Sequence, residues 1–165
     1  IVAVSTAAFF DNMAPLVGRS ASQDEMANLY WTMAAKGRAF SGVDHLNHIE
    51  AVRSMSREMA ATMLPFDVWL LPTTPMLPRP HGYYDMSLDV DAYNAECMAP
   101  DASFTMPFNA SGLPAISLPM SSSAAGLPIG IQLVGRDCDE VTLLRLAGQI
   151  ERANPWRHRA PPTCS

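Results

Sequence analysis

Two Gly-Leu-Pro units set the strongest limit on how this chain folds. Gly112-Leu113-Pro114 leads into a short apolar run at 115–118, and Gly126-Leu127-Pro128 leads into a second run at 129–134. Glycine and proline interrupt regular structure, so these runs predict two strands joined by a small polar loop at 120–125. We expect the two strands to be either a hairpin or a pair of near neighbours.

A third strand is expected at 67–71. Its sequence, DVWLL, is almost wholly apolar and stops at Pro72, which is typical of a strand buried on both faces. Such a strand needs helices on both sides of its sheet. Four prolines lie within 72–80, so residues 72–84 are expected to form an extended surface loop.

Helical periodicity marks three longer stretches. The first begins at Ser20 or Ser22 and ends near Gly37, the second follows Ser41 and ends before Pro65, and the third begins at Asp137 or Asp139 and stops at Asn154-Pro155. A short helix is expected around 103–109, and the acidic segment 85–93 is expected to be turn-like. Amphipathic helices lying on buried strands predict an α/β fold, a mixed β-sheet flanked by helices.

Composition narrows the class of protein. The chain has 165 residues, a formal net charge of −5 and 11 scattered basic residues, which does not suit a nucleic-acid partner. No apolar run approaches the roughly 20 residues that a membrane span requires. The three cysteines form no CxxC pair, which fits a reducing cytoplasm better than a disulfide framework or a zinc ribbon.

Several residues that suggest chemistry have simpler interpretations. Ser121-Ser122-Ser123 lacks a glycine elbow and a base, so it is interpreted as a loop. His45 and His48 lack HExxH spacing and are assigned to a solvated helix face. The acidic segment 85–94 lacks the glycine and closing glutamate of a calcium loop, and the cysteines are interpreted as small buried hydrophobes. We therefore expect no metal and no cofactor.

Three motifs, taken in order, resemble the C-terminal part of the amidase signature family. Residues 104–156 carry a T-x-P-x-N-x-x-G-x-P-A-x-S-x-P block followed by G-L-P-x-G-x-Q-L-x-G and a terminal helix. Upstream, FDVWLLPTTP at 66–75 resembles the family's strand and Pro-Thr loop, and the helix at 37–58 is similar to that of bacterial amidases of the nylon-oligomer cyclic-dimer hydrolase type. Together the motifs cover essentially the whole chain.

The resemblance implies hydrolysis of a carbon–nitrogen amide bond through an acyl-enzyme, with a serine nucleophile, a second serine in a cis peptide and a lysine. In the family the lysine and the two serines lie in the N-terminal half, and the serines belong to a GGSSGGS-type run that follows the lysine. This sequence has one lysine, Lys36, in a different context, and no Gly-Ser-Ser-Gly. No catalytic residue is carried over, and this chain alone is expected to be inactive.

Residues 1–165 are accordingly expected to be the C-terminal segment of a single amidase domain. The sequence begins at Ile1, without a methionine and within an apolar pattern, which suggests a fragment. We expect the apolar surfaces of such a fragment to be covered by the missing N-terminal half or by self-association.

The family resemblance also implies three substrate-binding residues. Ala102 and Met106, four positions apart, correspond to the wall of the acyl pocket, where an alanine in place of an acidic residue favours a neutral, apolar small-molecule amide. Thr74, beside Thr73 at the end of a strand, is expected to support the pocket. Two alternatives remain at this point: a non-catalytic assembly or interaction module derived from the same fold, and a self-sufficient hydrolase of another mechanism.

Overall fold

The computed structural model describes residues 1–157 of the chain. The chain divides into two compact units. The first comprises Ile1–Ser54 and Arg79–Pro100, and the second comprises Met55–Pro78 and the segment from Asp101 onward. Cys164, one of the three cysteines discussed above, lies outside the described residues.

The first unit contains a helix that the sequence pattern did not predict. Helix α1 (Val2–Val17) packs against helix α2 (Asn28–Ala39). The reason for this packing is visible at Gly37, which is buried and faces the backbone of α1. A Cβ atom built on Gly37 would lie 2.0 Å from the carbonyl oxygen of Ala3. Gly37 therefore permits a close helix crossing, and α2 ends two residues later at Ala39, near the predicted end.

The predicted start of α2 at Ser20 or Ser22 was wrong. The stretch that follows Ser22 forms only a short 3₁₀ turn (Gln23–Glu25), and α2 begins later, at Asn28. The Glu25 carboxylate accepts hydrogen bonds from the Ser22 amide and hydroxyl, both at 3.0 Å, and from Arg19 at 2.8 Å. The Ser22 and Glu25 contacts form a capping box around this turn, and the chain becomes extended at Met26 before α2 begins.

Helix α3 (Gly42–Met63) confirms the sequence prediction closely. The Asp44 amide donates to the Ser41 hydroxyl at 3.1 Å, while the Asp44 carboxylate accepts from the Ser41 amide at 3.0 Å. This reciprocal arrangement is a capping box with aspartate in place of the usual glutamate.

The acidic segment 85–93 is less turn-like than predicted. The Asp89 carboxylate accepts hydrogen bonds from the amides of Asp91 and Ala92, both at 2.9 Å, and so caps α4 (Val90–Tyr93). The chain continues through the π-helical turn η2 (Asn94–Met98) into α5 (Ala99–Asp101). An aspartate that suggested a turn is therefore a helix cap, since the same side chain serves both structures.

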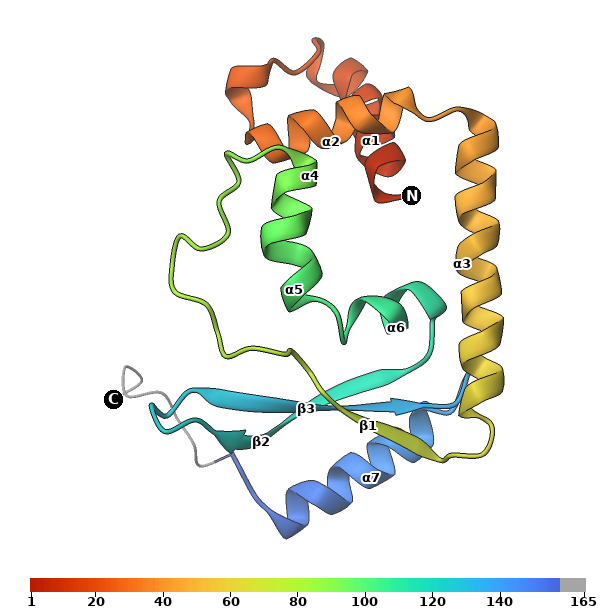
Figure 1. The fold of residues 1–165 in the computed structure, drawn as a ribbon, viewed down its shortest axis with the longest axis vertical. Helices are drawn as coiled ribbons and strands as arrows, with labels where there is room; N and C mark the ends of the chain where they lie inside the picture. The colour runs from red at the N-terminus through yellow and green to blue at the C-terminus, as the bar shows by residue number, and fades with distance from the viewer. Residues whose placement is uncertain (158–165) are drawn as a thin grey trace. The chain divides into compact units, whose positions relative to one another are not determined.

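The second unit is built on a three-stranded antiparallel sheet with the strand order β1-β3-β2 (Figure 1). Its strands are β1 (Val68–Pro72), β2 (Ala115–Ser122) and β3 (Pro128–Gly135). All three strands were predicted, and β2 and β3 form the hairpin. Arg136 fixes the start of β1 by donating to the Phe66 carbonyl oxygen and to the Asp67 carboxylate, both at 2.9 Å. The α/β class is confirmed.

Helices cover the two faces of this sheet, as Figure 1 shows for α6 (Met106–Ser111) and α7 (Glu140–Ala153). Helix α7, capped by Asp139, packs on β2 and β3 and forms a core of Leu118, Leu133, Leu143 and Ala147. On the opposite face, Phe108 and Leu113 pack against Val134.

The expectation that β1 is buried on both faces was wrong. Leu70, which lies on the same face of the sheet as Leu133, is 67% exposed. The reason is that β1 lies at an edge of the described sheet, whereas α7 covers β2 and β3.

Candidate functional site

Two hollows flank the chain where it leaves β1. Thr73 and Thr74 follow the last residue of the strand, and the Thr73 amide extends the ladder by donating to the Gly130 carbonyl oxygen at 3.1 Å. One hollow, of about 340 Å³, is lined by Thr73, Thr74, Ser117, Pro119, Pro128 and Gly130. The other, of about 290 Å³, is lined by Thr74 together with 72, 75–77 and 128–130. Thr74 thus borders both.

A pair of hydroxyl groups lines the larger hollow. Thr73 Oγ1 and Ser117 Oγ lie 2.6 Å apart; Thr73 directly follows β1 and Ser117 lies on β2, the strands on either side of β3. Between them lies Gly130, where an added Cβ would be 2.7 Å from the Thr73 oxygen and 2.9 Å from the Ser117 oxygen. The hydroxyl pair therefore exists in this geometry only because position 130 has no side chain.

The other two predicted site residues lie in the turn that leads into α6. The Ala102 carbonyl oxygen accepts hydrogen bonds from the Met106 amide at 2.9 Å and from the Thr105 amide at 3.2 Å. Ala102 is half-buried, and Met106 is 45% exposed. This turn is tied to the sheet by Gln132, a buried polar residue whose Nε2 donates to the Phe104 carbonyl oxygen at 2.8 Å.

Strand register relates these two regions. Gln132 pairs with Ser117 on β2, and Gly130 is two residues away on β3. Because side chains alternate across a sheet, Gln132, Ser117 and position 130 share one face, the face that carries the 102–106 turn. Of the predicted site residues, Ala102 and Met106 belong to that turn, but neither of them lines the two hollows beside Thr74.

Sequence reasoning missed Ser117, Gly130 and Gln132 as site residues. The signal was present, because Ser117 is the serine of the A-x-S-x-P block and the other two are the glycine and glutamine of G-x-Q-L. What the sequence did not supply was the register that aligns these positions across three strands.

The serine run and the cysteines have separate surroundings, and the expectation that the cysteines are buried was wrong for Cys138, which is exposed. The interpretation of the serine run as a loop was wrong for Ser121 and Ser122, which end β2 and pair with β3. Ser123 lies in the turn that follows, where its hydroxyl accepts from the Leu127 amide at 3.1 Å. The neighbouring Asp137 carboxylate raises the pKa of the Cys138 thiol, which disfavours the reactive thiolate. Cys97 is buried, with its Sγ 3.7 Å from the Tyr83 carbonyl oxygen. Within residues 1–157, no group of three or more His, Cys, Asp or Glu side chains is placed to hold a metal ion.

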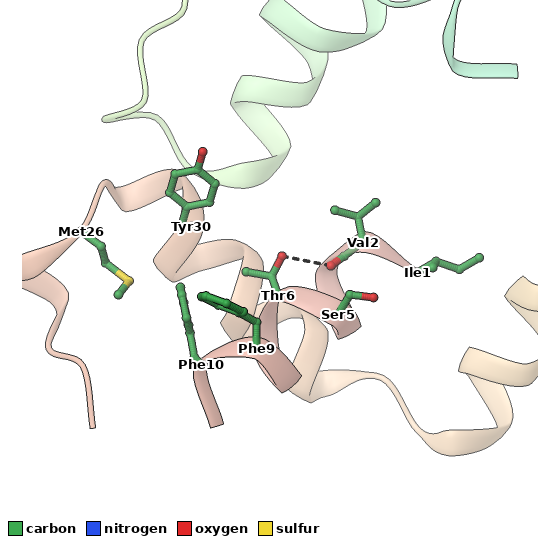
Figure 2. Close-up of a pocket in the computed structure, with 8 residues that line it drawn as sticks. All are labelled: Ile1, Val2, Ser5, Thr6, Phe9, Phe10, Met26 and Tyr30. Atoms are coloured by element: carbon green, nitrogen blue, oxygen red, sulfur yellow. Dashed lines mark hydrogen bonds between the residues drawn. The ribbon is translucent and has the colours of Figure 1, made fainter. Parts of the chain in front are cut away.

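The first unit has an apolar hollow of about 490 Å³ beside α1 (Figure 2). Its lining is almost entirely hydrocarbon, and the Thr6 hydroxyl is already bonded to the Val2 carbonyl oxygen at 3.0 Å. Phe9 is 59% exposed at its rim. Such a surface suits packing against another apolar surface better than bond-breaking chemistry. Across the described part of the chain, no helix combines the length and apolar character needed to cross a membrane.

Comparison with known proteins is consistent with the sheet, the strand order and the motif residues. The family model described as Amidase matches residues 6–144. The 6-aminohexanoate-cyclic-dimer hydrolase of Paenarthrobacter ureafaciens is 34% identical over 157 residues, which cover 88% of this chain and 31% of that protein. A solved structure of 6-aminohexanoate cyclic dimer hydrolase superposes with a TM-score of 0.92 at 28% identity, covering 99% of this chain and 35% of that one.

A crystal structure of another amidase shares the fold, with a TM-score of 0.71 at 21% identity over 92% of this chain. The chain belongs to the amidase family. The chain resembles the cyclic-dimer hydrolase in both sequence and structure. It spans about a third of the length of that relative.

Proposed function

We propose that residues 1–165 are the C-terminal segment of an amidase domain that hydrolyses carbon–nitrogen amide bonds. In this proposal a serine attacks the amide carbonyl, the amine leaves, and water releases the acyl group from the serine. The serine, its cis-peptide partner serine and the lysine come from outside these residues. The observation that carries the proposal is family membership over residues 6–144 combined with a sequence that contains a single lysine.

That lysine is engaged on the surface of the first unit. Lys36 is exposed on α2 and forms an ion pair with Asp91, whereas the lysine of this mechanism serves a serine. This chain therefore contributes scaffold and pocket wall to the enzyme. We also propose a cytoplasmic location, because the cysteines form no CxxC pair and Cys97 and Cys138 are free thiols.

We assign Ala102, Met106 and Thr74 to the wall and support of the substrate pocket. Ala102 and Met106 present only hydrocarbon and thioether surface, so they favour an apolar, uncharged acyl group over one bearing an ammonium. In support, Gln132 ties the turn that carries both residues to the sheet through the Phe104 carbonyl oxygen.

A chimeric enzyme tests the proposal. The matching third of the P. ureafaciens hydrolase is replaced by residues 1–165, and hydrolysis of apolar amides is compared between the chimera and the isolated chain. We expect turnover by the chimera and none by the isolated chain. A folded chimera without activity would favour the alternative, a non-catalytic assembly module, and turnover by the isolated chain would refute the proposed division of roles.

Substitution of Met106→Glu in the chimera tests the pocket wall. Glutamate suits the first turn of a helix, so the change is compatible with folding of α6. A carboxylate in an apolar wall should nevertheless lower kcat/KM for apolar amides by at least roughly tenfold. Met98→Glu, at a methionine of similar exposure in the other unit, serves as the matched control. Equal kcat/KM values for the two variants would remove Met106 from the pocket.

A further inference from the structure

Tyr83 fastens the segment 79–84 to the π-helical turn η2 in the first unit. Its hydroxyl donates to the Glu96 carbonyl oxygen at 3.0 Å, and its own carbonyl oxygen accepts from the Cys97 thiol, with the sulfur 3.7 Å away. The Arg79 guanidinium lies over the Tyr83 ring, 4.4 Å from its centre, and so supports the ring from within the segment. A single residue thus holds the segment through both its side chain and its backbone.

The sequence explains why the π turn offers an acceptor to Tyr83. In an α-helix the Glu96 carbonyl would accept from the amide of residue 100, but Pro100 has no N–H, and a proline ring at that position crowds this carbonyl. The helix widens instead, and the Ala99 amide donates to the carbonyl oxygen of Asn94. The Glu96 carbonyl can then accept from outside the helix, and the Tyr83 hydroxyl is the donor.

The contact with Tyr83 also covers the Cys97 thiol. Cys97 is 3% exposed, whereas Glu96 and Met98 on either side of it are exposed. The segment that lies against the sulfur is itself at the surface, because His81 and Gly82 are exposed. Surface segments can open locally at a lower free energy than unfolding of the whole protein requires.

We propose that residues 79–84 form a strap that opens from the π turn, with Tyr83 as its latch and the Cys97 thiol accessible only in the open state. A local turn shapes the closed strap, since the Tyr83 amide donates to the Pro80 carbonyl oxygen at 3.2 Å and Gly82 adopts a φ of 85°. A compound that caps the thiol holds the strap open, because the capped sulfur is larger and has no proton to donate to Tyr83. The strap does not depend on the proposed amidase activity.

Thiol labelling of the 165-residue chain tests the latch. In a Cys164→Ser background, N-ethylmaleimide labelling of Cys97 and Cys138 is followed in the same sample at one pH by peptide mass spectrometry. Cys138 is exposed, so it provides the internal control. Tyr83→Phe keeps the ring beside Arg79 but removes the hydroxyl. We expect it to speed Cys97 labelling by roughly fivefold to tenfold, the effect of one hydrogen bond, and to leave Cys138 labelling unchanged.

Pro100→Ala provides a second, independent variant. It gives residue 100 an N–H that competes with the Tyr83 hydroxyl for the Glu96 carbonyl, so it should also speed labelling of Cys97. Combined with Tyr83→Phe it should add little, because both changes remove the same bond. Circular dichroism verifies that each variant is folded. Fully multiplicative effects of the two substitutions would contradict the role assigned to Pro100.

Low concentrations of urea separate opening of the strap from unfolding of the chain. Local opening exposes little surface, so the rate of Cys97 labelling should change little with urea below the unfolding transition. A rate that rises with urea as steeply as global unfolding would overturn the strap. Equal Cys97 labelling rates in folded Tyr83→Phe and in the wild type would overturn the latch.

Discussion

Gly37 shows how a single position determines the packing of two helices. A methyl group there would meet the Ala3 carbonyl at 2.0 Å, and backbone cannot move aside as a flexible side chain can. We expect Gly37→Ala to lower the free energy of unfolding by about 2–3 kcal/mol in urea titrations. Gly42→Ala, at a helical glycine with open space around it, should leave that free energy unchanged or raise it by up to about 1 kcal/mol. Similar losses in both variants would contradict the close crossing.

Glu25 gives a pH-dependent prediction at the same scale. Hydrogen bonds from the Arg19 guanidinium, and then from Ser22, lower the pKa of Glu25 from 4.5 to about 2. Because the folded-state pKa is depressed, the stabilising contribution is complete above the unfolded value and is lost as pH falls from 4.5 towards 2.

The stability difference between the wild type and Glu25→Gln should therefore shrink as the pH is lowered through that window. Urea midpoints of both proteins, measured at intervals from about pH 6 downward, provide the comparison. A difference that stays constant as the glutamate titrates would show that the Arg19 and Ser22 bonds contribute nothing.

At the scale of elements, α7 offers two adjacent leucines with opposite environments. Leu143 is buried against Leu118 and Leu133, whereas Leu144 is 63% exposed. Leu143→Ala should cost about 2–5 kcal/mol through lost burial and a residual cavity. Leu144→Ala should change stability by no more than about 0.5 kcal/mol, measured in the same urea titration. Comparable effects of the two substitutions would mean that α7 does not pack on the sheet in solution as described.

The elements that could be predicted from sequence are those with local signals. Strands β2 and β3 begin at Gly-Leu-Pro units, and β1 ends at Pro72. Helices α3 and α7 follow Ser41 and Asp139, residues whose side chains cap the first turn. Helix α1 was missed because its apolar residues are not confined to one face and Pro15 lies inside it. The helical segment from Val90 was missed because a π turn departs from the 3.6-residue period.

The candidate site was predictable only in part, for a related reason. Thr74, Ala102 and Met106 came from their places in motifs, but the Thr73–Ser117 pair depends on register across β1, β3 and β2. Register is a property of paired strands that are distant in sequence, so no local pattern determines it.

At the scale of the whole molecule, the proposal that further polypeptide outside residues 1–165 completes the amidase domain has a measurable consequence. The exposed apolar residues of α1 include Val2, Phe9, Leu16 and Val17, at 59–79% exposure. In water such a surface favours self-association. Sedimentation velocity should show the purified 165-residue chain shifting to larger species as its concentration rises.

A double substitution, Phe9→Ser with Leu16→Glu, should reduce this association without disturbing the buried residue Ala7. Replacing Tyr84, exposed at 46% on another segment, by serine serves as the comparison. A wild-type chain that sediments as a monomer at every concentration would argue that residues 1–165 need no covering partner.

The strand order has one further consequence. With β3 already paired on both sides, any strand added to the described sheet must join the outer margin of β1 or of β2. Pro119 withholds a backbone donor from β2, and the register shifts directly after it, so an incoming strand meets a break there. The stretch Val68–Leu71 has no such break. We therefore expect an additional strand to pair with the outer edge of β1 rather than with that of β2.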